Sequence, residues 1–190
     1  IYEHVKFDNF KFFTIAQLKK LKDRTLTMNG VSKAYAMTGW RIGYAAGPKN
    51  IIAAIRKIQS QSTSNPSSIS QAAAVEALNG TQSFIKKRAK SFSDRRNFVV
   101  NYLNSIPGIT CLMPKGAFYV FPSCKALIGK KTKIKNDTDF VQKLLEKQNV
   151  AVVQGSAFGL DGYFRISYAT SMKKLKIAMD RIKRFCESLG

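Results

Sequence analysis

Apolar residues recur at helical spacing in the first half of this 190-residue chain. Pro48 suits the first turn of a helix, and the polar residues beyond position 58 interrupt its apolar pattern. A second helix is predicted to start at Ser64 or Asn65. It begins just before Pro66 and stops at Gly80. The apolar face of the first helix carries Ile51, Ile52, Ile55 and Ile58.

Three further helices follow along the chain. The first opens at Thr81 and ends at Pro107-Gly108, the second covers about 138–148, and the last begins at Ser171, whose hydroxyl can cap it. Their apolar residues are predicted to face inward. In chain order these are Phe84, Ile85, Ala89, Phe92, Val99, Tyr102 and Leu103, then Phe140, Val141, Leu144 and Leu145, then Met172, Leu175, Met179, Ile182 and Phe185.

Shorter apolar segments between these helices are predicted to be β-strands. They are residues 25–31, 41–47, 109–113, 116–121, 150–153 and 163–169. A bend is expected at 114–116, and the aromatic-rich first dozen residues are expected to form a loop packed on a core. Helices packed on one side of a small sheet give an α+β or an α/β fold class.

The composition is that of an ordinary globular protein, with 45% hydrophobic and 23% charged residues. No apolar run approaches the roughly 18 residues that span a bilayer. The cysteines at 111, 124 and 186 are odd in number and widely spaced, which argues against a disulfide framework or a zinc site. His4 is the only histidine, so we expect no histidine-based metal site. A reducing, cytoplasmic location is predicted.

The formal net charge of +21 is the abnormal feature of the composition. A strongly basic protein can bind nucleic acid. The positive residues are spread over every segment, however, and the densest run, 130–135, is predicted to be a loop. No zinc-finger, RNP or helix-turn-helix signature accompanies the charge. We therefore interpret most of these lysines as solvated and keep a nucleic-acid-binding module as an alternative.

Lys33 and Arg41 form the most informative pair in the chain. Lys33 follows the predicted strand 25–31, and Arg41 stands eight residues later at the start of the next strand. A desolvated amine can form a Schiff base with an aldehyde, while a guanidinium holds a phosphate through two parallel hydrogen bonds. Pyridoxal phosphate carries both groups.

The residues that surround this pair strengthen the interpretation. Ser32-Lys33 is followed by a small and aromatic stretch and then by Gly39-Trp-Arg-Ile-Gly43. This segment resembles the lysine segment of fold-type I pyridoxal-phosphate aminotransferases of class I, in particular the bacterial aspartate aminotransferases. The likeness continues through Pro48, residues 59–63, Lys115-Gly-Ala-Phe-Tyr119 and Phe164-Arg-Ile-Ser-Tyr168, and so covers essentially the whole chain.

The resemblance implies the C-terminal portion of the pyridoxal-phosphate-dependent transferase fold. Residues 1–80 would be the end of the large cofactor-binding domain, 81–108 the interdomain helix and 109–190 the small α/β domain. A family aspartate that pairs with the pyridine nitrogen would fall two positions upstream of Ile1. We therefore expect a C-terminal piece with little activity of its own, and uncovered strand edges that favour self-association.

The resemblance also implies roles for four residues. Lys33 would bind the cofactor aldehyde and move a proton between the substrate α-carbon and the cofactor, a task that requires a neutral amine. Arg41 would anchor the phosphate, and the phenol of Tyr2 would hydrogen-bond the ring oxygen. A phosphate-binding serine of some members falls at Gly30, so that contact is absent or replaced. Tyr35 and Trp40 can line the pocket or pack in the core.

Arg165 is the fourth of these residues. A guanidinium inside an apolar strand is costly unless it meets an anion. The matching arginine of the family binds the α-carboxylate of the amino-acid substrate, for which a bidentate fork is well shaped. A structural ion pair is the alternative, although the chain has few acidic residues.

The activity that the resemblance implies is reversible transfer of an amino group between an L-amino acid and a 2-oxo acid. Aspartate and 2-oxoglutarate are the expected pair, and a homodimer is the expected assembly. Two other interpretations stay open at this point. One is the basic nucleic-acid-binding module, and the other is a non-catalytic remnant of the same fold.

Overall fold

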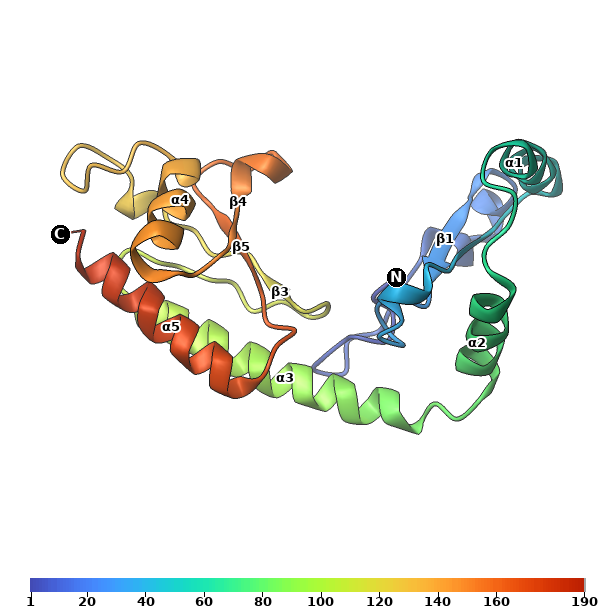
Figure 1. The fold of residues 1–190 in the computed structure, drawn as a ribbon, viewed down its shortest axis with the longest axis horizontal. Helices are drawn as coiled ribbons and strands as arrows, with labels where there is room; N and C mark the ends of the chain where they lie inside the picture. The colour runs from blue at the N-terminus through green and yellow to red at the C-terminus, as the bar shows by residue number, and fades with distance from the viewer. Residues whose placement is uncertain (190) are drawn as a thin grey trace. The chain divides into compact units, whose positions relative to one another are not determined.

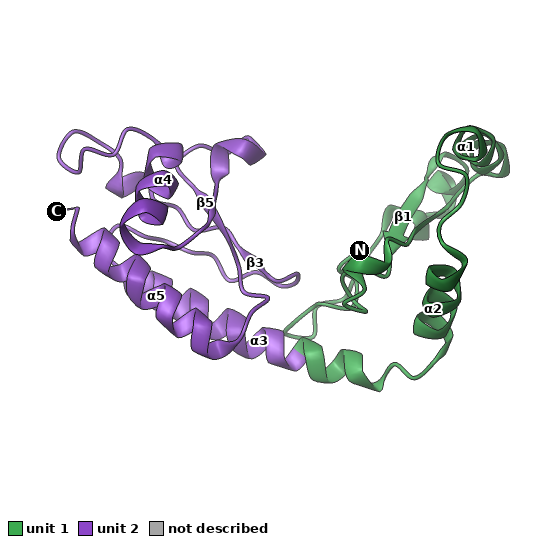
Figure 2. Ribbon diagram, viewed as in Figure 1, with its two compact units in different colours: residues 1–89 green, residues 90–190 purple. Residues whose placement is uncertain are grey.

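The computed structural model describes residues 1–189 and divides into two compact units. Unit 1 runs from Ile1 to Ala89 and unit 2 starts at Lys90 (Figure 2). The division falls inside the helix α3, Ser83–Asn104, which lies within the segment predicted to connect two domains. The three-part domain assignment itself stays a prediction.

Unit 1 is built on a two-stranded antiparallel hairpin (Figure 1). Strand β1, Thr27–Gly30, pairs with β2, Gly43–Ala46, so that Thr27 faces Ala46 and Gly30 faces Gly43. Both strands were predicted, and each is shorter than its apolar segment. Three short 3₁₀ helices accompany the hairpin: η1 (Ile15–Gln17), η2 (Lys19–Arg24) and η3 (Thr38–Trp40).

Two α-helices complete the first unit. Helix α1, Lys49–Ser62, begins after Pro48 as predicted, but it continues through the polar residues that were expected to interrupt it. Its isoleucines are largely exposed, with Ile58 reaching 70%. Helix α2, Ser68–Asn79, ends at Gly80 as predicted, but it starts after Ser67 instead of at Ser64 or Asn65. Ser64 has a φ of 61°, which is outside the helical region and explains the later start.

Unit 2 contains a three-stranded antiparallel sheet in the order β3-β5-β4. Its strands are β3 (Tyr119–Val120), β4 (Val153–Gln154) and β5 (Phe164–Ser167). Two 3₁₀ helices, η4 (Lys125–Leu127) and η5 (Gly155–Phe158), lie in its connections. Along β5, Phe164 and Ile166 are buried and alternate with Arg165 and Ser167, so one face of the sheet meets the core.

Two helices of unit 2 follow the predicted pattern. Helix α4, Asp137–Gln148, begins at Asn136, whose side chain accepts a hydrogen bond from the Asp139 N–H. Helix α5, Met172–Glu187, begins at Ser171, whose hydroxyl accepts from the Lys174 N–H at 3.3 Å. Their buried faces join α3 and the sheet in one core that includes Val99, Leu103, Phe140, Leu144, Phe164, Met179, Ile182 and Phe185.

The predicted strand 109–113 is wrong. Only Thr110 makes a bridge, to Ser123, and Leu112 is 90% exposed. The side chain of Asn104 takes the place of a neighbouring strand at Cys111. Its amide donates to the Cys111 carbonyl at 2.9 Å and accepts from the Cys111 N–H at 2.7 Å. A side chain therefore satisfies the backbone that a sheet was predicted to satisfy.

Two smaller differences lie in the same unit. The predicted strand 116–121 shrinks to β3, because Ala117 has a φ of 60° and so leaves the extended region. Leu145, which was predicted to face inward on α4, is 49% exposed.

The three cysteines are buried and unpaired. Within residues 1–189, no helix is both long enough and apolar enough to cross a membrane.

Candidate functional site

The hairpin of unit 1 closes a loop that contains both predicted cofactor residues. Pairing continues past the last strand residues, since the Val31 N–H donates to the Ile42 carbonyl at 3.4 Å. Val31 and Ile42 are buried together with Ala74 and fix both ends of this loop. The segment 31–42, called here the lysine loop, is therefore tied at its base to the unit's small core.

Lys33 lies in the turn directly after β1 and is half-buried. The next residue, Ala34, is buried, and the Lys33 carbonyl accepts a hydrogen bond from the Ala36 N–H at 3.2 Å. Within residues 1–189, no carboxylate lies within ion-pair distance of the Lys33 amine. The backbone is thus held by contacts that leave the amine available.

Thr38 links the two ends of the lysine loop. Its hydroxyl donates to the carbonyl of Ser32, the neighbour of Lys33, at 3.2 Å. Its own carbonyl accepts from Nη1 of Arg41 at 2.9 Å. The structure therefore brings Arg41 to the same end of the hairpin as Lys33. Sequence reasoning missed this threonine, although it stands inside the quoted motif.

The lysine loop holds two residues in a conformation that L-amino acids rarely adopt. Ala36 and Arg41 both have a φ of 55°. The left-handed region costs a non-glycine residue about 1–2 kcal/mol. Such strain persists only where surrounding contacts impose it, and it concentrates at functional sites. At Arg41 the conformation directs a charged side chain back over the 3₁₀ turn η3.

Tyr2 is placed beside the end of β1 by its two neighbours. The Asn29 amide donates to the Glu3 carboxylate at 2.6 Å, and a Cβ added at Gly30 would lie 3.8 Å from Cδ1 of Ile1. Since Lys33 follows Gly30 by three residues, the structure brings Tyr2, Lys33 and Arg41 to one region of unit 1. Tyr2 itself is half-buried.

Gly30 occupies the position where some family members have a phosphate-binding serine. It is buried, and an added Cβ would lie 2.9 Å from the Ile42 carbonyl and 3.3 Å from the Cα of Gly43. A serine would therefore force the two strands of the hairpin apart. Close backbone approach accounts for the glycine, and the serine contact is absent.

The beginning of α3 and the residue before it form hydrogen bonds with the lysine loop. The Tyr35 hydroxyl donates to the Gln82 side chain at 3.2 Å, and Nη1 of Arg88 donates to the Ala34 carbonyl at 3.3 Å. Burial, followed by the nearby Glu3 carboxylate, raises the pKa of the Tyr35 phenol. Arg88 adds another positive charge next to Lys33.

Arg165 lies in unit 2, on the face of the sheet that is turned away from the core. Its guanidinium carbon is 4.7 Å from the ring centre of Tyr119 and 4.6 Å from that of Phe158. No carboxylate within the described chain pairs with it, so the structural ion pair considered above is not formed there. Sequence reasoning missed both rings, although Tyr119 belongs to a quoted motif segment.

The side chains of the lysine loop fit an anionic aldehyde ligand. They offer an amine without an ion-pair partner and an exposed guanidinium, with a further arginine close by. The described residues contain no group of three or more histidine, cysteine or acidic side chains that could hold a metal ion. Pyridoxal phosphate, which carries an aldehyde and a phosphate, matches this set of donors.

Comparison with known proteins identifies relatives of the chain. The chain is 59% identical over 195 residues to an aspartate aminotransferase of Rhizobium meliloti (strain 1021), and the match covers all of this chain and 48% of that protein. It is 60% identical over 191 residues to a probable aspartate/prephenate aminotransferase of Rhizobium leguminosarum bv. phaseoli, covering 98% and 48%. The chain thus spans about half the length of these curated relatives.

Structural comparison finds proteins of the same kind. A crystal structure of the aspartate aminotransferase from Rhizobium meliloti superposes with a TM-score of 0.96 at 59% identity, covering all of this chain and 49% of the other. The mixed α/β architecture is thus that of pyridoxal-phosphate-dependent aminotransferases. The family model of "Aminotransferase class I and II" matches residues 1–182. From sequence and fold alike, the chain belongs to the class I and II aminotransferase family.

Proposed function

We propose that the protein transfers an amino group between an L-amino acid and a 2-oxo acid with pyridoxal phosphate as cofactor. The observation that carries this proposal is the lysine loop, in which Thr38 ties the backbone beside Lys33 to the guanidinium of Arg41. The family match gives no support to the nucleic-acid-binding module considered from the net charge.

Three residues of unit 1 would hold the cofactor. When bound, pyridoxal phosphate supplies an aldehyde that accepts an amino group and a ring that withdraws electrons from the substrate α-carbon. Lys33 would hold the aldehyde end of the cofactor through Nζ and would carry the proton that leaves the substrate α-carbon. Arg41 binds the phosphate, and the Tyr2 hydroxyl donates to the ring oxygen. The contacts of Thr38 keep Lys33 and Arg41 in register.

Arg165 would bind the α-carboxylate of the substrate. Its guanidinium is half-buried and lies between two rings, which leaves the N–H donors in its plane free for a bidentate carboxylate. Aspartate and 2-oxoglutarate are the proposed pair. The name of the first relative supports aspartate, and that of the second adds prephenate as a candidate for the 2-oxo acid.

The working assembly is proposed to be a cytoplasmic homodimer, in line with the family resemblance. Residues 1–190 taken alone are proposed to turn over amino acids slowly. No carboxylate in the described lysine loop is placed to pair with the pyridine nitrogen, and the electron-withdrawing ring depends on that counter-charge.

A reconstitution experiment tests the cofactor assignment. The chain is mixed with the part of the Rhizobium meliloti enzyme that the match leaves out, pyridoxal phosphate is added, and the near-visible absorption of lysine-bound cofactor is recorded. Borohydride reduction followed by peptide mapping then locates the modified lysine. We expect label on Lys33 and loss of the absorption band in Lys33→Ala. Lys49→Ala, an exposed lysine at the start of α1, is the matched control.

Turnover is followed in the same mixture as oxaloacetate formed from aspartate and 2-oxoglutarate. We expect at least a thousandfold loss of turnover in Lys33→Ala, since the residue that binds cofactor and moves the proton is gone. Cofactor bound to another lysine, or unchanged turnover in Lys33→Ala, would refute the assignment. Cofactor bound at Lys33 without any turnover would instead favour a non-catalytic remnant of the fold.

A further inference from the structure

The guanidinium of Arg165 is held by stacking between aromatic rings. Its carbon atom is 4.7 Å from the Tyr119 ring centre and 4.6 Å from the Phe158 ring centre. Stacking orders a guanidinium while leaving its in-plane donors free. The position of Arg165 therefore depends on what fixes these two rings.

The sheet fixes Tyr119. Strand β3 pairs with β5 so that Tyr119 faces Ser167, which stands two residues beyond Arg165. Residues two apart on a strand share one face, so Tyr119, Ser167 and Arg165 lie on the same side of the sheet. Strand pairing therefore fixes the position of one of the two rings.

Phe158 has no strand to fix it. It is the last residue of the 3₁₀ turn η5, and it is 48% exposed. The turn begins at Gly155, whose N–H donates to the Tyr163 carbonyl at 2.7 Å and where an added Cβ would collide with the Leu160 carbonyl. Gly159 closes the turn with a φ of 74°. The geometry of η5 thus positions Phe158, whose ring also lies edge-on to that of Phe121, with 5.8 Å between the ring centres.

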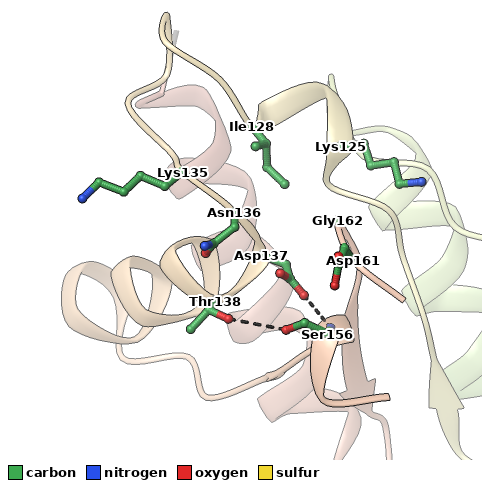
Figure 3. Close-up of a pocket in the computed structure, with 9 residues that line it drawn as sticks. All are labelled: Lys125, Ile128, Lys135, Asn136, Asp137, Thr138, Ser156, Asp161 and Gly162. Carbon is green, nitrogen blue, oxygen red and sulfur yellow. Dashed lines mark hydrogen bonds between the residues drawn. The ribbon is translucent and has the colours of Figure 1, made fainter. Parts of the chain in front are cut away.

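A buried carboxylate ties η5 to the start of α4. Asp137 is 2% exposed, and its Oδ2 accepts a hydrogen bond from the Ser156 N–H at 2.6 Å (Figure 3). Thr138 adds a hydroxyl contact with the Ser156 side chain at 3.5 Å. These residues line a cavity of about 400 Å³. A charge is rarely buried without a specific partner, and here the partner is the backbone of the turn that carries Phe158.

We propose that Asp137 is a positioning residue for Arg165. By holding the Ser156 N–H, it fixes η5, and η5 places the Phe158 ring against the guanidinium that Tyr119 contacts from β3. The ordered guanidinium then meets a carboxylate without first losing side-chain freedom. This inference rests on the proposed function, because Arg165 matters as a carboxylate site only within it.

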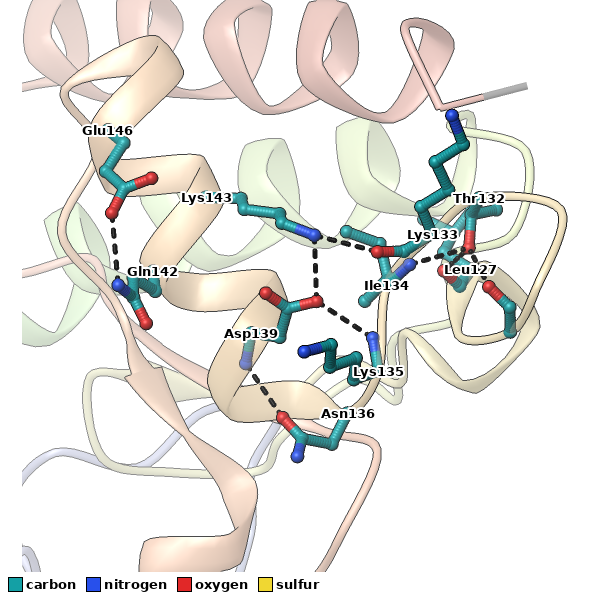
Figure 4. Close-up of polar contacts among 11 residues, drawn as sticks. Leu127, Thr132, Lys133, Ile134, Lys135, Asn136, Asp139, Gln142, Lys143 and Glu146 are labelled. Carbon is teal, nitrogen blue, oxygen red and sulfur yellow. Dashed lines mark hydrogen bonds and ion pairs between the residues drawn. The ribbon is translucent and has the colours of Figure 1, made fainter.

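Asp139 provides a matched control on the same helix turn. Its carboxylate accepts from the Lys135 N–H at 2.8 Å and from Nζ of Lys143 at 3.0 Å (Figure 4). It therefore fastens the beginning of α4 to the loop before it, and none of its hydrogen bonds within residues 1–189 goes to η5. Replacing Asp139 disturbs the same helix end and leaves the Phe158 ring in place.

The test uses the 190-residue chain labelled with ¹⁵N and reads the Nε–Hε signal of Arg165, which is assigned with Arg165→Lys. Protons over aromatic ring faces shift upfield, so we expect an upfield Hε signal in the unaltered chain. Phe158→Leu and Asp137→Ala should move it toward the ordinary arginine position, and Asp139→Ala should not. Asp137→Asn, which keeps an acceptor for the Ser156 N–H, should restore most of the upfield shift.

Titration with succinate, a simple dicarboxylate, gives the second readout at the same signal. Loss of one stacking ring and of side-chain order is expected to weaken succinate binding about threefold to tenfold in Phe158→Leu and in Asp137→Ala. Asp139→Ala is expected to bind as the unaltered chain does. Phe158 is largely exposed, so its leucine variant should fold even if Asp137→Ala does not.

The outcomes separate the two proposals. An ordinary Hε position in the unaltered chain, or an Hε signal that Phe158→Leu leaves unchanged, would overturn the ring arrangement. Equal responses of Asp137→Ala and Asp139→Ala would overturn the role of Asp137. An upfield signal that depends on Asp137 but does not respond to succinate would support the positioning contact. That result would count against Arg165 as the carboxylate site, and so against the proposed function.

Discussion

The two units of this chain differ in how they bury apolar residues. Unit 2 encloses a continuous core in which Phe140, Phe164, Met179 and Phe185 are completely buried. Unit 1 buries a small cluster of Val31, Ile42 and Ala74, with a few further residues such as Phe7. Most of the large apolar side chains that are exposed belong to unit 1, and three of the four isoleucines of α1 are among them: Ile51, Ile55 and Ile58.

Unit 2 is thus held together mainly by its own core, whereas unit 1 is held together mainly by the contacts around its candidate site. The lysine loop in unit 1 is fixed mainly by hydrogen bonds, strand ends and strained backbone. The ring pair around Arg165 in unit 2 is fixed by a sheet and a turn that pack on a core. We therefore expect unit 2 to unfold as a stable unit of its own and unit 1 to be the less stable of the two.

The largest expected effect lies in the core of unit 2. Phe140→Ala removes a fully buried ring that lies 5.1 Å from the Phe164 ring and 5.2 Å from the Phe185 ring. The unfolding free energy of unit 2 should fall by about 3–5 kcal/mol. Urea unfolding followed by amide signals of unit 2 measures it. Phe13→Ala, at a site 58% exposed, should change stability by less than about 0.5 kcal/mol, and equal costs would contradict the comparison.

The small core of unit 1 should give a smaller effect. Val31→Ala deletes two methyl groups at a site that is 0% exposed and should cost about 2 kcal/mol. Trp40 is the single tryptophan and lies in unit 1, so its fluorescence follows this unit alone. The exposed Val75 of α2 provides the control variant Val75→Ala. A Trp40 transition at higher urea than that of unit 2 would reverse our ranking of the units.

Unfolding measured over a range of pH tests how much Asp139 contributes to the stability of unit 2. The Lys135 N–H, followed by the Lys143 ammonium, holds the pKa of Asp139 below its ordinary value. Its folded form is thus stabilised at pH above the ordinary carboxyl pKa, and that contribution is lost as the pH falls through the lowered value. Asp139→Asn should cost about 1 kcal/mol at neutral pH and nothing at the acid limit.

Urea unfolding of unit 2 across the acid range measures this loss. The control is Asp94→Asn, because Asp94 is exposed and pairs with Lys90 at 3.6 Å. That exposed pair should contribute at most about 0.5 kcal/mol at any pH. The same pH dependence in both variants would show that Asp139 has no special role.

The smallest effect on stability is expected on the exposed face of α1. Ile58→Lys replaces a side chain that is 70% exposed and should change the unfolding free energy of unit 1 by less than about 0.5 kcal/mol. It should nevertheless reduce binding of an apolar fluorescent dye and self-association measured by sedimentation. Leu145→Lys, at an isolated exposed site of unit 2, is the control and should change neither. Unaltered dye binding in Ile58→Lys would show that this face is not the apolar surface of unit 1.

Sequence reasoning succeeded where local signals decide the structure. Pro48, Ser171 and Gly80 mark helix ends by their own backbone or hydroxyl chemistry, and the buried faces of α4 and α5 follow from spacing. It failed at 109–113, because the partner that satisfies Cys111 is a side chain seven residues away and not a strand. Apolar spacing cannot distinguish these two partners.

The same limit applies to the sites. The motif around Lys33 carries its residue types in sequence order, so Lys33 and Arg41 were identified without a structure, and their roles stay predictions. The rings around Arg165 come from β3 and from η5, which are distant in sequence, and only the sheet register and the turn bring them together. Nothing in the spacing of Asp137 indicates its contact with Ser156.

The left-handed backbone at Arg41 makes the residue that is best for stability differ from the residue that is best for the proposed phosphate binding. Glycine or asparagine would adopt that conformation with less strain, yet either would remove the cation. A random library at this codon that is screened for expression alone should drift toward those two residues. The same library screened for the proposed binding of pyridoxal phosphate should return arginine, so the residue that is enriched reports which property was selected.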